Sequence, residues 1–295
     1  MEIDVMRTTN GYFAGQDRSR LYYQLLRPQE PPRAALVCVH GIGEHSGRYE
    51  FLTQGLVKAG FAVFAYDHRG HGRSDGARGH IHAWEDYRDD LRAALRQVAS
   101  LLAGVPAFLY GHSMGSLVVL DYLMESPEEV RGAVISGAAI EPVGVGTPRQ
   151  IALAKLLSRL WPTFSIKLEK DFSKKLSQDP AVIQAFDEDP LVLHAVTARW
   201  GAESLKTVER VKNNPQAIRL PVLFIHGDND PVNTVEGARR YFEQIASTEK
   251  RLVVYPDCLH EPHNELLRDR VVRDVTRWVE QVLERQTTES VREGM

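Results

Sequence analysis

The residue in this chain best suited to chemistry is a serine flanked by glycines, in the segment Gly-His-Ser-Met-Gly at 111–115. The apolar run at 107–110 predicts a strand before it, and the run at 117–120 predicts a helix after it. So tight a turn needs the two glycines, because side chains there would clash. The turn also brings the hydroxyl close to a helix N-terminus, whose free N–H groups favour developing negative charge. The pattern therefore predicts that Ser113 is a nucleophile.

A serine hydroxyl becomes a good nucleophile when a base takes its proton, and the base needs a third group to orient it. Both partners should lie after predicted strands, because the carboxyl ends of parallel strands meet at one edge of a sheet. After the apolar run at 221–226, the acid could be Asp228 or Asp230. Asp230 is favoured because Pro231 holds it extended, whereas an aspartate in the position of Asp228 commonly caps its own loop.

Two histidines compete for the role of base after the predicted strand at 251–255. They are His260 and His263, and His260 lies nearer the end of the strand. Three other histidines are expected to have hydrogen-bonding or positioning roles: His226, with a backbone partner at its strand end, and His112 and His40.

Acyl transfer also needs two N–H donors for the oxyanion that forms during attack. The N–H of Met114, directly after the serine, is one candidate. The second is expected in the glycine-containing loop after the apolar run at 34–39, most simply the N–H of Ile42. Glycines in such a loop let the backbone approach a ligand closely.

A histidine-containing loop at 67–82 raises the alternative of a metal site. No Cys-x-x-Cys or His-Glu-x-x-His pattern accompanies its histidines. A hydrogen-bonded loop is the favoured interpretation, so we expect neither a metal nor a cofactor.

Composition excludes several other classes of function. The net charge of −3 on 295 residues gives no basic field for nucleic acid. No run of eighteen apolar residues predicts a membrane span, and residues 1–15 lack the pattern of a secretory signal. Two cysteines, Cys38 and Cys258, do not make a disulfide framework in so long a chain. These features predict a cytoplasmic protein, with any membrane contact peripheral.

Strand and helix patterns alternate through most of the chain, which predicts an α/β fold with a mostly parallel, doubly wound sheet. An opening hairpin is expected at 8–26, on a sheet edge. The alternation stops at 141–214, where helical segments are expected near 153–161, 181–186 and 191–209. An insertion of about seventy residues predicts a helical lid on a core made of residues 1–140 and 215–285. The polar residues 286–295 are expected to form a frayed tail.

Three segments in register resemble the monoacylglycerol lipase and lysophospholipase group of α/β-hydrolases. They are His-Gly-Ile-Gly-Glu-His-Ser-Gly-Arg-Tyr (40–49), Asp-His-Arg-Gly-His-Gly-Arg-Ser (67–74) and Gly-His-Ser-Met-Gly (111–115). The resemblance covers nearly the whole chain, and its chain order of serine, acid and histidine is that of α/β-hydrolases. It implies a cofactor-free serine esterase with Ser113, Asp230 and His260 as triad and Ile42 and Met114 as oxyanion hole. Glu44, Arg48 and His263 match polar positions at the headgroup end of the pocket. The chain departs from the family at Ser116, where a glycine is common.

The resemblance also implies the substrate, a single-chain lipid ester such as a monoacylglycerol or a lysophospholipid, cleaved through an acyl-enzyme. In the predicted lid, Leu153, Leu156, Leu157, Leu160 and Trp161 share one helical face. Leu157 and Leu160 are candidates to line the acyl chain, and the rest of the face could rest transiently on a membrane surface. Packing of the whole face on the core is the alternative. The sequence gives no oligomeric state.

Two other functions remain compatible with the same scaffold. A peptidase of the proline-iminopeptidase type would need an acidic anchor for the substrate amine, for which Glu44 and Glu141 are candidates. A ligand-binding protein without activity would be expected to have lost part of the triad, whereas every triad position is filled here. A lyase or perhydrolase on this scaffold would keep the same three residues.

Overall fold

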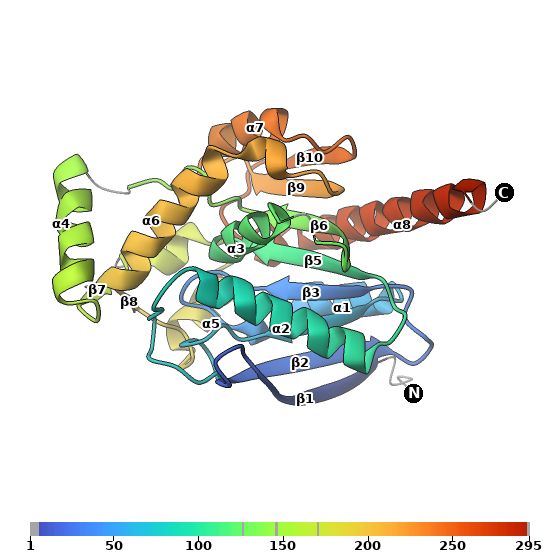
Figure 1. Cartoon of the computed structure of the whole chain (residues 1–295), viewed down its shortest axis with the longest axis horizontal. Coiled ribbons are helices and arrows are strands. Elements are labelled where there is room, and N and C mark those ends of the chain that lie inside the picture. Colours follow the sequence, from blue (N-terminus) through green and yellow to red (C-terminus); the bar gives the residue numbers. More distant parts are fainter. Residues whose placement is uncertain (1–5, 126, 145–146, 170, 294–295) are drawn as a thin grey trace.

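A mixed sheet forms the centre of the molecule, in a computed structural model that describes residues 6–125, 127–144, 147–169 and 171–293. The strand order is β1-β2-β4-β3-β5-β6-β9-β10 (Figure 1). The bounds are β1 Met6–Ala14, β2 Arg20–Pro28, β3 Ala35–Val39, β4 Ala62–Tyr66, β5 Ala107–His112, β6 Val130–Ser136, β9 Val222–Gly227 and β10 Lys250–Tyr255. Neighbouring strands from β4 to β10 are parallel, and the β1–β2 hairpin joins antiparallel at the edge. The predicted α/β fold with a mostly parallel sheet is confirmed.

Helices cover both faces of this sheet, as expected for strands that are apolar on both sides. Alternate residues of β3 divide between the two cores: Val37 belongs to one core and Leu36 to the other. The helices α1 (Glu50–Lys58) and α8 (Arg268–Glu293) pack on the side of Leu36. The helices α2 (Glu85–Leu101), α3 (Met114–Leu123) and α7 (Val235–Gln244) pack on the side of Val37. Loops at the carboxyl ends of the strands are therefore held between two rigid layers.

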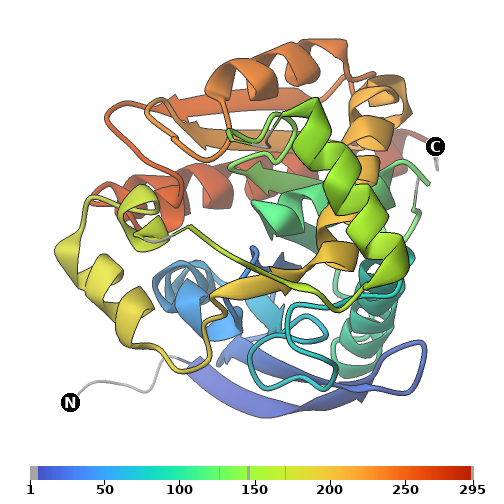
Figure 2. The ribbon, with the colours of Figure 1, turned by 90° about the vertical axis from the view of Figure 1, so that its left-hand side faces the viewer.

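The segment between β6 and β9 forms a separate group of elements at one end of the sheet, away from both chain termini (Figure 1; facing the viewer in Figure 2). It comprises α4 Pro148–Leu160, β7 Ser165–Lys167, η2 Phe172–Lys175, α5 Pro180–Glu188, β8 Ala195–Thr197 and α6 Ala198–Lys212, followed by η3 Pro215–Ala217. Helix α6 contacts both α4 and the core helix α3. The insertion is therefore anchored to the core through α6.

Two predicted boundaries were wrong. Residues 195–197 are a strand and not part of a helix, because they pair with β7 and because Thr197 Oγ1 accepts the N–H of Trp200 and so starts α6 at Ala198. At the other end, α8 continues to Glu293, where a frayed tail was expected from residue 286. Residues 294–295 of that expected tail lie outside the described residues. Among the described helices, none has the length and apolar composition to cross a membrane.

Candidate active site

The turn between β5 and α3 holds Ser113 in an unusual conformation. Its backbone has φ 50° and ψ −118°, a region that side chains rarely adopt. The Ser113 N–H donates to the carbonyl of Ser136 on β6 at 2.9 Å. A Cβ at Gly115 would clash with the carbonyl oxygen of Val39, so only glycine lets α3 begin so close to β3. The turn therefore points the serine side chain out of the sheet edge.

Three side chains from separate loops form a continuous chain of hydrogen bonds. Ser113 Oγ lies 2.8 Å from His260 Nε2, and His260 Nδ1 lies 2.8 Å from Asp230 Oδ2. The three residues follow the ends of β5, β10 and β9, and all three are buried. Asp228 is exposed, and its carboxylate instead accepts the N–H of Cys258 at 3.4 Å. The fold thus brings Asp230, and not Asp228, to His260.

The electrostatics of this chain suit general-base catalysis. Burial acts to lower the pKa of His260, but the charge and hydrogen bond of Asp230 outweigh it, so the pKa is raised. Burial acts to raise the pKa of Asp230, but His260 and His226 together hold it well below its usual range. Asp230 therefore stays ionised and orients a histidine of increased basicity. The contact of His226 with Asp230 was missed at the sequence level, although the two residues are only four positions apart.

The loop after β3 is shaped by its own hydrogen bonds. The Gly41 N–H donates to Glu44 Oε1 at 2.7 Å, and the Gly43 carbonyl accepts the N–H of Leu193 from the insertion at 2.7 Å. His40 Nε2 accepts the His68 N–H at 2.9 Å, which leaves the proton on Nδ1 to donate to the Gly41 carbonyl at 2.7 Å. Burial lowers the pKa of His40 to about 3, in keeping with this neutral tautomer.

The two residues expected at the oxyanion hole both lie near the serine. Met114 is the first residue of α3, where a backbone N–H has no partner within the helix. Ile42 lines the cavity that contains Ser113. An oxyanion hole built from the N–H groups of Ile42 and Met114 stays a prediction.

A buried ionic cluster lies beside the serine. Arg48 pairs with Glu261 at 2.9 Å and with Glu44 at 3.5 Å, and all three side chains are buried. Burial and the charge of Glu261 raise the pKa of Glu44 to about 7. Glu44 Oε2 is buried without a hydrogen-bond partner. Glu261 was missed at the sequence level, although its position next to His260 was a usable signal.

Comparisons with known proteins place the chain among hydrolases. Residues 30–266 match the family model described as serine aminopeptidase, S33. The chain is 35% identical to a monoacylglycerol lipase of Mycolicibacterium smegmatis, over 90% of this chain and 95% of that protein. It is 32% identical to the monoglyceride lipase of Rattus norvegicus, over 91% and 89% of the two chains. The crystal structure of Paleococcus ferrophilus monoacylglycerol lipase superposes with a TM-score of 0.78 at 30% identity, covering 94% of this chain and 99% of that one.

The chain belongs to the α/β-hydrolase family whose model matches residues 30–266 and which includes these lipases. Its relatives, together with the serine at the turn after β5, make it a serine hydrolase of the lipase and esterase type. The resemblance identified from the three sequence segments is thereby confirmed at the level of the family.

The cavity at Ser113 of the hydrolase is small and is lined in part by the insertion. Its volume is about 10 Å³, which is room for about one water molecule. The lining residues are Ile42, Glu44, His112, Ser113, Phe172, Leu176, Phe186, His260 and Glu261. Three of these, at 172, 176 and 186, come from the insertion and form its apolar wall.

Leu157 and Leu160, expected at the acyl chain, are not among the residues that line this cavity. Leu160 is 76% exposed and Leu157 is half-buried. In the second half of α4, Ser158 is the buried residue, so the helix turns this serine inward and its leucines toward solvent. The apolar wall is instead formed by residues that follow α4. Phe172 and Leu176 have the i, i+4 spacing that could have signalled a shared face.

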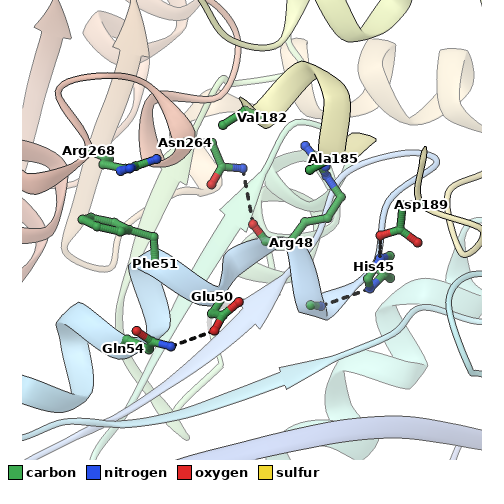
Figure 3. Close-up of a pocket in the computed structure, with 11 residues that line it drawn as sticks. His45, Arg48, Glu50, Phe51, Gln54, Val182, Ala185, Asp189, Asn264 and Arg268 are labelled. Carbon is green, nitrogen blue, oxygen red and sulfur yellow. Dashed lines mark hydrogen bonds and ion pairs between the residues drawn. The ribbon is translucent and has the colours of Figure 1, made fainter. Parts of the chain in front are cut away.

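Arg48 and His263 also lie outside the lining of the cavity, whereas Glu44 is part of it. The Arg48 guanidinium stacks over Phe186 at 4.7 Å, and Arg48 is one of the residues that line an outer groove of about 370 Å³ (Figure 3). In this groove, His45 Nε2 pairs with Asp189 Oδ2 at 2.8 Å, which joins the core to the insertion. His263 stacks on Tyr49 at 4.6 Å, and burial lowers its pKa to about 4.

One group of side chains in the described part of the chain could offer atoms to a metal ion. Glu44, His112 and Glu261 have ligand atoms within 4.8 Å of one another. Arg48 already pairs with both carboxylates and supplies their counter-charge. We therefore assign no metal to this position.

Proposed function

We propose that this hydrolase cleaves monoacylglycerols through an acyl-enzyme, with Ser113 as nucleophile, His260 as base and Asp230 as the orienting acid. Ser113 Oγ attacks the ester carbonyl while His260 Nε2 takes its proton. The N–H groups of Ile42 and Met114 bind the oxyanion. His260 then gives the proton to the departing alcohol, and a water molecule activated by the same histidine releases the fatty acid. The support is the unbroken chain of hydrogen bonds from Ser113 to Asp230.

The observation that carries the choice of headgroup is an oxygen of Glu44 that accepts no hydrogen bond, although Arg48 Nε lies 3.5 Å from it as an ion-pair partner. Oε2 is buried, and Glu44 lines the cavity that contains Ser113. Such an oxygen favours a ligand that donates a hydrogen bond, as the hydroxyl groups of glycerol do. A lysophospholipid keeps one glycerol hydroxyl but replaces another by a phosphodiester, which offers only acceptors and negative charge, and Arg48 is already occupied by two carboxylates. This supports monoacylglycerol over the alternative, a lysophospholipid.

The same cluster argues against a peptidase, the activity for which the matching family model is described. An anchor for a cationic substrate amine needs a carboxylate whose charge is not already neutralised, whereas a hydroxyl needs only an acceptor atom. Glu44 pairs with Arg48, and Glu141 pairs with Arg240 and Lys212. Because Glu141 is also absent from the lining of the cavity, neither candidate anchor favours an aminopeptidase.

The exposed face of α4 fits a substrate that is delivered by a lipid surface. Leu153, Leu156, Leu160 and Trp161 are each at least half exposed, at 55%, 51%, 76% and 59%. Lys155 and Arg159 are exposed on the same helix. Apolar side chains flanked by basic ones are typical of helices that lie in a membrane interface. We extend the proposal to a transient contact between α4 and a membrane surface.

The test is a hydrolysis panel on the wild type and on Glu44→Gln. The panel compares a long-chain monoacylglycerol, lysophosphatidylcholine, a short aryl ester and an aminoacyl arylamide. Glutamine keeps one carbonyl oxygen for the Gly41 N–H and the Tyr49 hydroxyl but replaces Oε2, the oxygen that accepts no hydrogen bond, with an amide nitrogen. We expect wild-type kcat/KM to be highest for monoacylglycerol and Glu44→Gln to lower it about tenfold, with the aryl ester little affected. Preference for lysophosphatidylcholine or for the arylamide would contradict the proposal.

A further inference from the structure

A second buried imidazole contacts the candidate catalytic aspartate. His226, near the end of β9, is fully buried. Its Nε2 lies 3.1 Å from Asp230 Oδ2 and 3.0 Å from the carbonyl oxygen of Asn233. The same Oδ2 lies 2.8 Å from His260 Nδ1. One carboxylate oxygen of Asp230 is therefore shared by two histidines, and His260 is the one that reaches Ser113.

The partners of His226 fix the position of its proton. A backbone carbonyl and an ionised carboxylate can only accept hydrogen bonds, so Nε2 must be the donor to both. His226 Nδ1 is buried and has no hydrogen-bond partner. A proton on Nδ1 would therefore be buried without an acceptor, which costs free energy. The tautomer with the proton on Nε2 satisfies the contacts of His226 with both Asp230 and the Asn233 carbonyl.

The other oxygen of Asp230 is held by the backbone. Oδ1 accepts the N–H of Val232 at 2.8 Å and the N–H of Asn233 at 3.0 Å. Besides His260 itself, His226 is thus the side chain that fixes Oδ2. It also donates to the Asn233 carbonyl, so it joins the carboxylate to its own loop.

We propose that His226 is a positioning residue of the triad, which holds Asp230 Oδ2 where it orients His260 and which moderates how strongly that oxygen attracts the proton of His260. The proposal rests on the triad proposed above, but it does not depend on the headgroup of the substrate.

Two consequences follow from losing this donor. The carboxylate becomes freer to rotate away from His260, so fewer molecules have the productive tautomer and orientation. In the molecules that keep the contact with His260, Asp230 Oδ2 has lost one of its two side-chain hydrogen bonds, so its charge acts more strongly on His260. A stronger interaction with the protonated imidazole raises the pKa of His260 further, and a larger share of the base is then protonated at a given pH.

Other titratable groups surround His260 and also affect its pKa, so the test must leave them unchanged. Glu261 and His263 belong to its own loop, Glu44 to the loop after β3 and His112 to the turn after β5, with the His112 ring centroid 4.8 Å away. His226 itself faces Asp230 and His112. A substitution at His226 leaves the four groups around His260 in place.

The experiment compares His226→Leu with His226→Gln, whose amide nitrogen can donate from a similar position. The matched control is His71→Leu, because His71 is equally buried, contacts a backbone carbonyl and has one unpartnered ring nitrogen. Active sites are counted by fluorophosphonate labelling of Ser113, and kcat and KM for a short aryl ester are measured across the acid limb of the pH profile. Normalising to labelled sites removes any loss that comes from unfolded protein.

For His226→Leu we expect kcat per labelled site to fall about tenfold or more, KM to stay unchanged and the acid limb to move to higher pH. His226→Gln should have nearly the wild-type kcat, with its acid limb close to the wild-type pH. In His71→Leu the acid limb should not move. If His226→Leu does not fold, His226→Met must show the same shift, since its unbranched side chain fills the space without a donor.

An unchanged acid limb with nearly normal kcat per labelled site in the Leu or Met variant would overturn the proposal. So would a glutamine variant as impaired as the leucine variant. Absence of label on Ser113 in the wild type would overturn the triad and this proposal together. Failure to prefer monoacylglycerol would count only against the proposed substrate, because the aryl ester does not report on the headgroup.

Discussion

The carbonyl of Leu176 in the insertion accepts the backbone N–H of Glu261, next to the candidate base, at 2.8 Å. At the other end of the same stretch, the Leu193 N–H donates to the carbonyl of Gly43 in the loop of the candidate oxyanion hole. Residues 176–193 are thus bound at both ends to the loops that hold His260 and Ile42. This half of the insertion forms part of the scaffold of the site, whereas α4 presents an exposed apolar face.

We predict that Gly43→Ala disrupts this connection. Gly43 has φ +76°, and a Cβ there would lie 2.8 Å from the carbonyl oxygen of Leu193. The matched control is Gly104→Ala, with φ +78° and nothing within 4 Å. Both variants should lose about 1–2 kcal/mol of stability from the strained φ. Only Gly43→Ala should lower kcat for an aryl ester, by about tenfold or more, and equal kcat in the two variants would contradict the connection.

Ser113 is expected to be the serine that a fluorophosphonate labels, because it combines the strained turn with a base 2.8 Å away. Mass spectrometry of the labelled protein identifies the site. Ser113→Ala should abolish labelling and lower kcat by several orders of magnitude, while the melting temperature stays close to that of the wild type. Labelling of a different serine in active protein would refute the assignment.

The acid of the triad can be tested with two neighbouring aspartates. Asp230→Asn should lower kcat by about 10⁴, because the amide lets the wrong tautomer of His260 dominate. Asp228→Asn serves as the control, since Asp228 is exposed and its carboxylate accepts the Cys258 N–H. The control should lose less than about tenfold. The reverse order of effects would move the acid to Asp228 without affecting the fold.

The pH dependence of kcat/KM should follow the deprotonation of His260. Asp230 raises the pKa of this buried histidine, so the inactive, protonated form persists to higher pH than for an ordinary histidine. We expect half-maximal activity above about pH 6.5, the usual histidine value. Glu44, with a pKa raised to about 7, titrates in the same range. A Glu44→Gln variant that retains the acid limb would assign that limb to His260, and an acid limb well below pH 6.5 would contradict the raised pKa.

The role of α4 at a lipid surface predicts a loss that depends on how the substrate is presented. Leu160→Gln should reduce binding to anionic vesicles and hydrolysis of monoacylglycerol held in them, with the soluble aryl ester unaffected. Leu160 is 76% exposed, so the melting temperature should not change. Leu266→Gln is the control, because Leu266 is 73% exposed but lies outside α4. Equal effects of the two substitutions on vesicle binding would argue against the role.

Local patterns were enough to predict the fold and the members of the candidate triad. The turn at Ser113 is specified by glycines whose added Cβ atoms would clash, and the parallel sheet follows from apolar strands alternating with amphipathic helices. Because parallel strands end at one edge, the chain order of Ser113, Asp230 and His260 was sufficient to expect their proximity. The preference for Asp230 came from its proline neighbour, a local effect on backbone conformation.

The wall of the cavity and the partners of the triad were decided by tertiary structure alone. Periodicity gave the apolar face of α4 but not the side on which it packs, so Leu160 was expected near the substrate and is instead 76% exposed. Glu261 acquires its importance from Arg48, a residue of another loop that the fold brings within hydrogen-bond distance. His226 acquires it from Asp230, four positions further along the chain, whose carboxylate lies 3.1 Å from the His226 ring. Side-chain periodicity reports which face of an element is apolar, whereas its neighbour across space depends on how the whole chain packs.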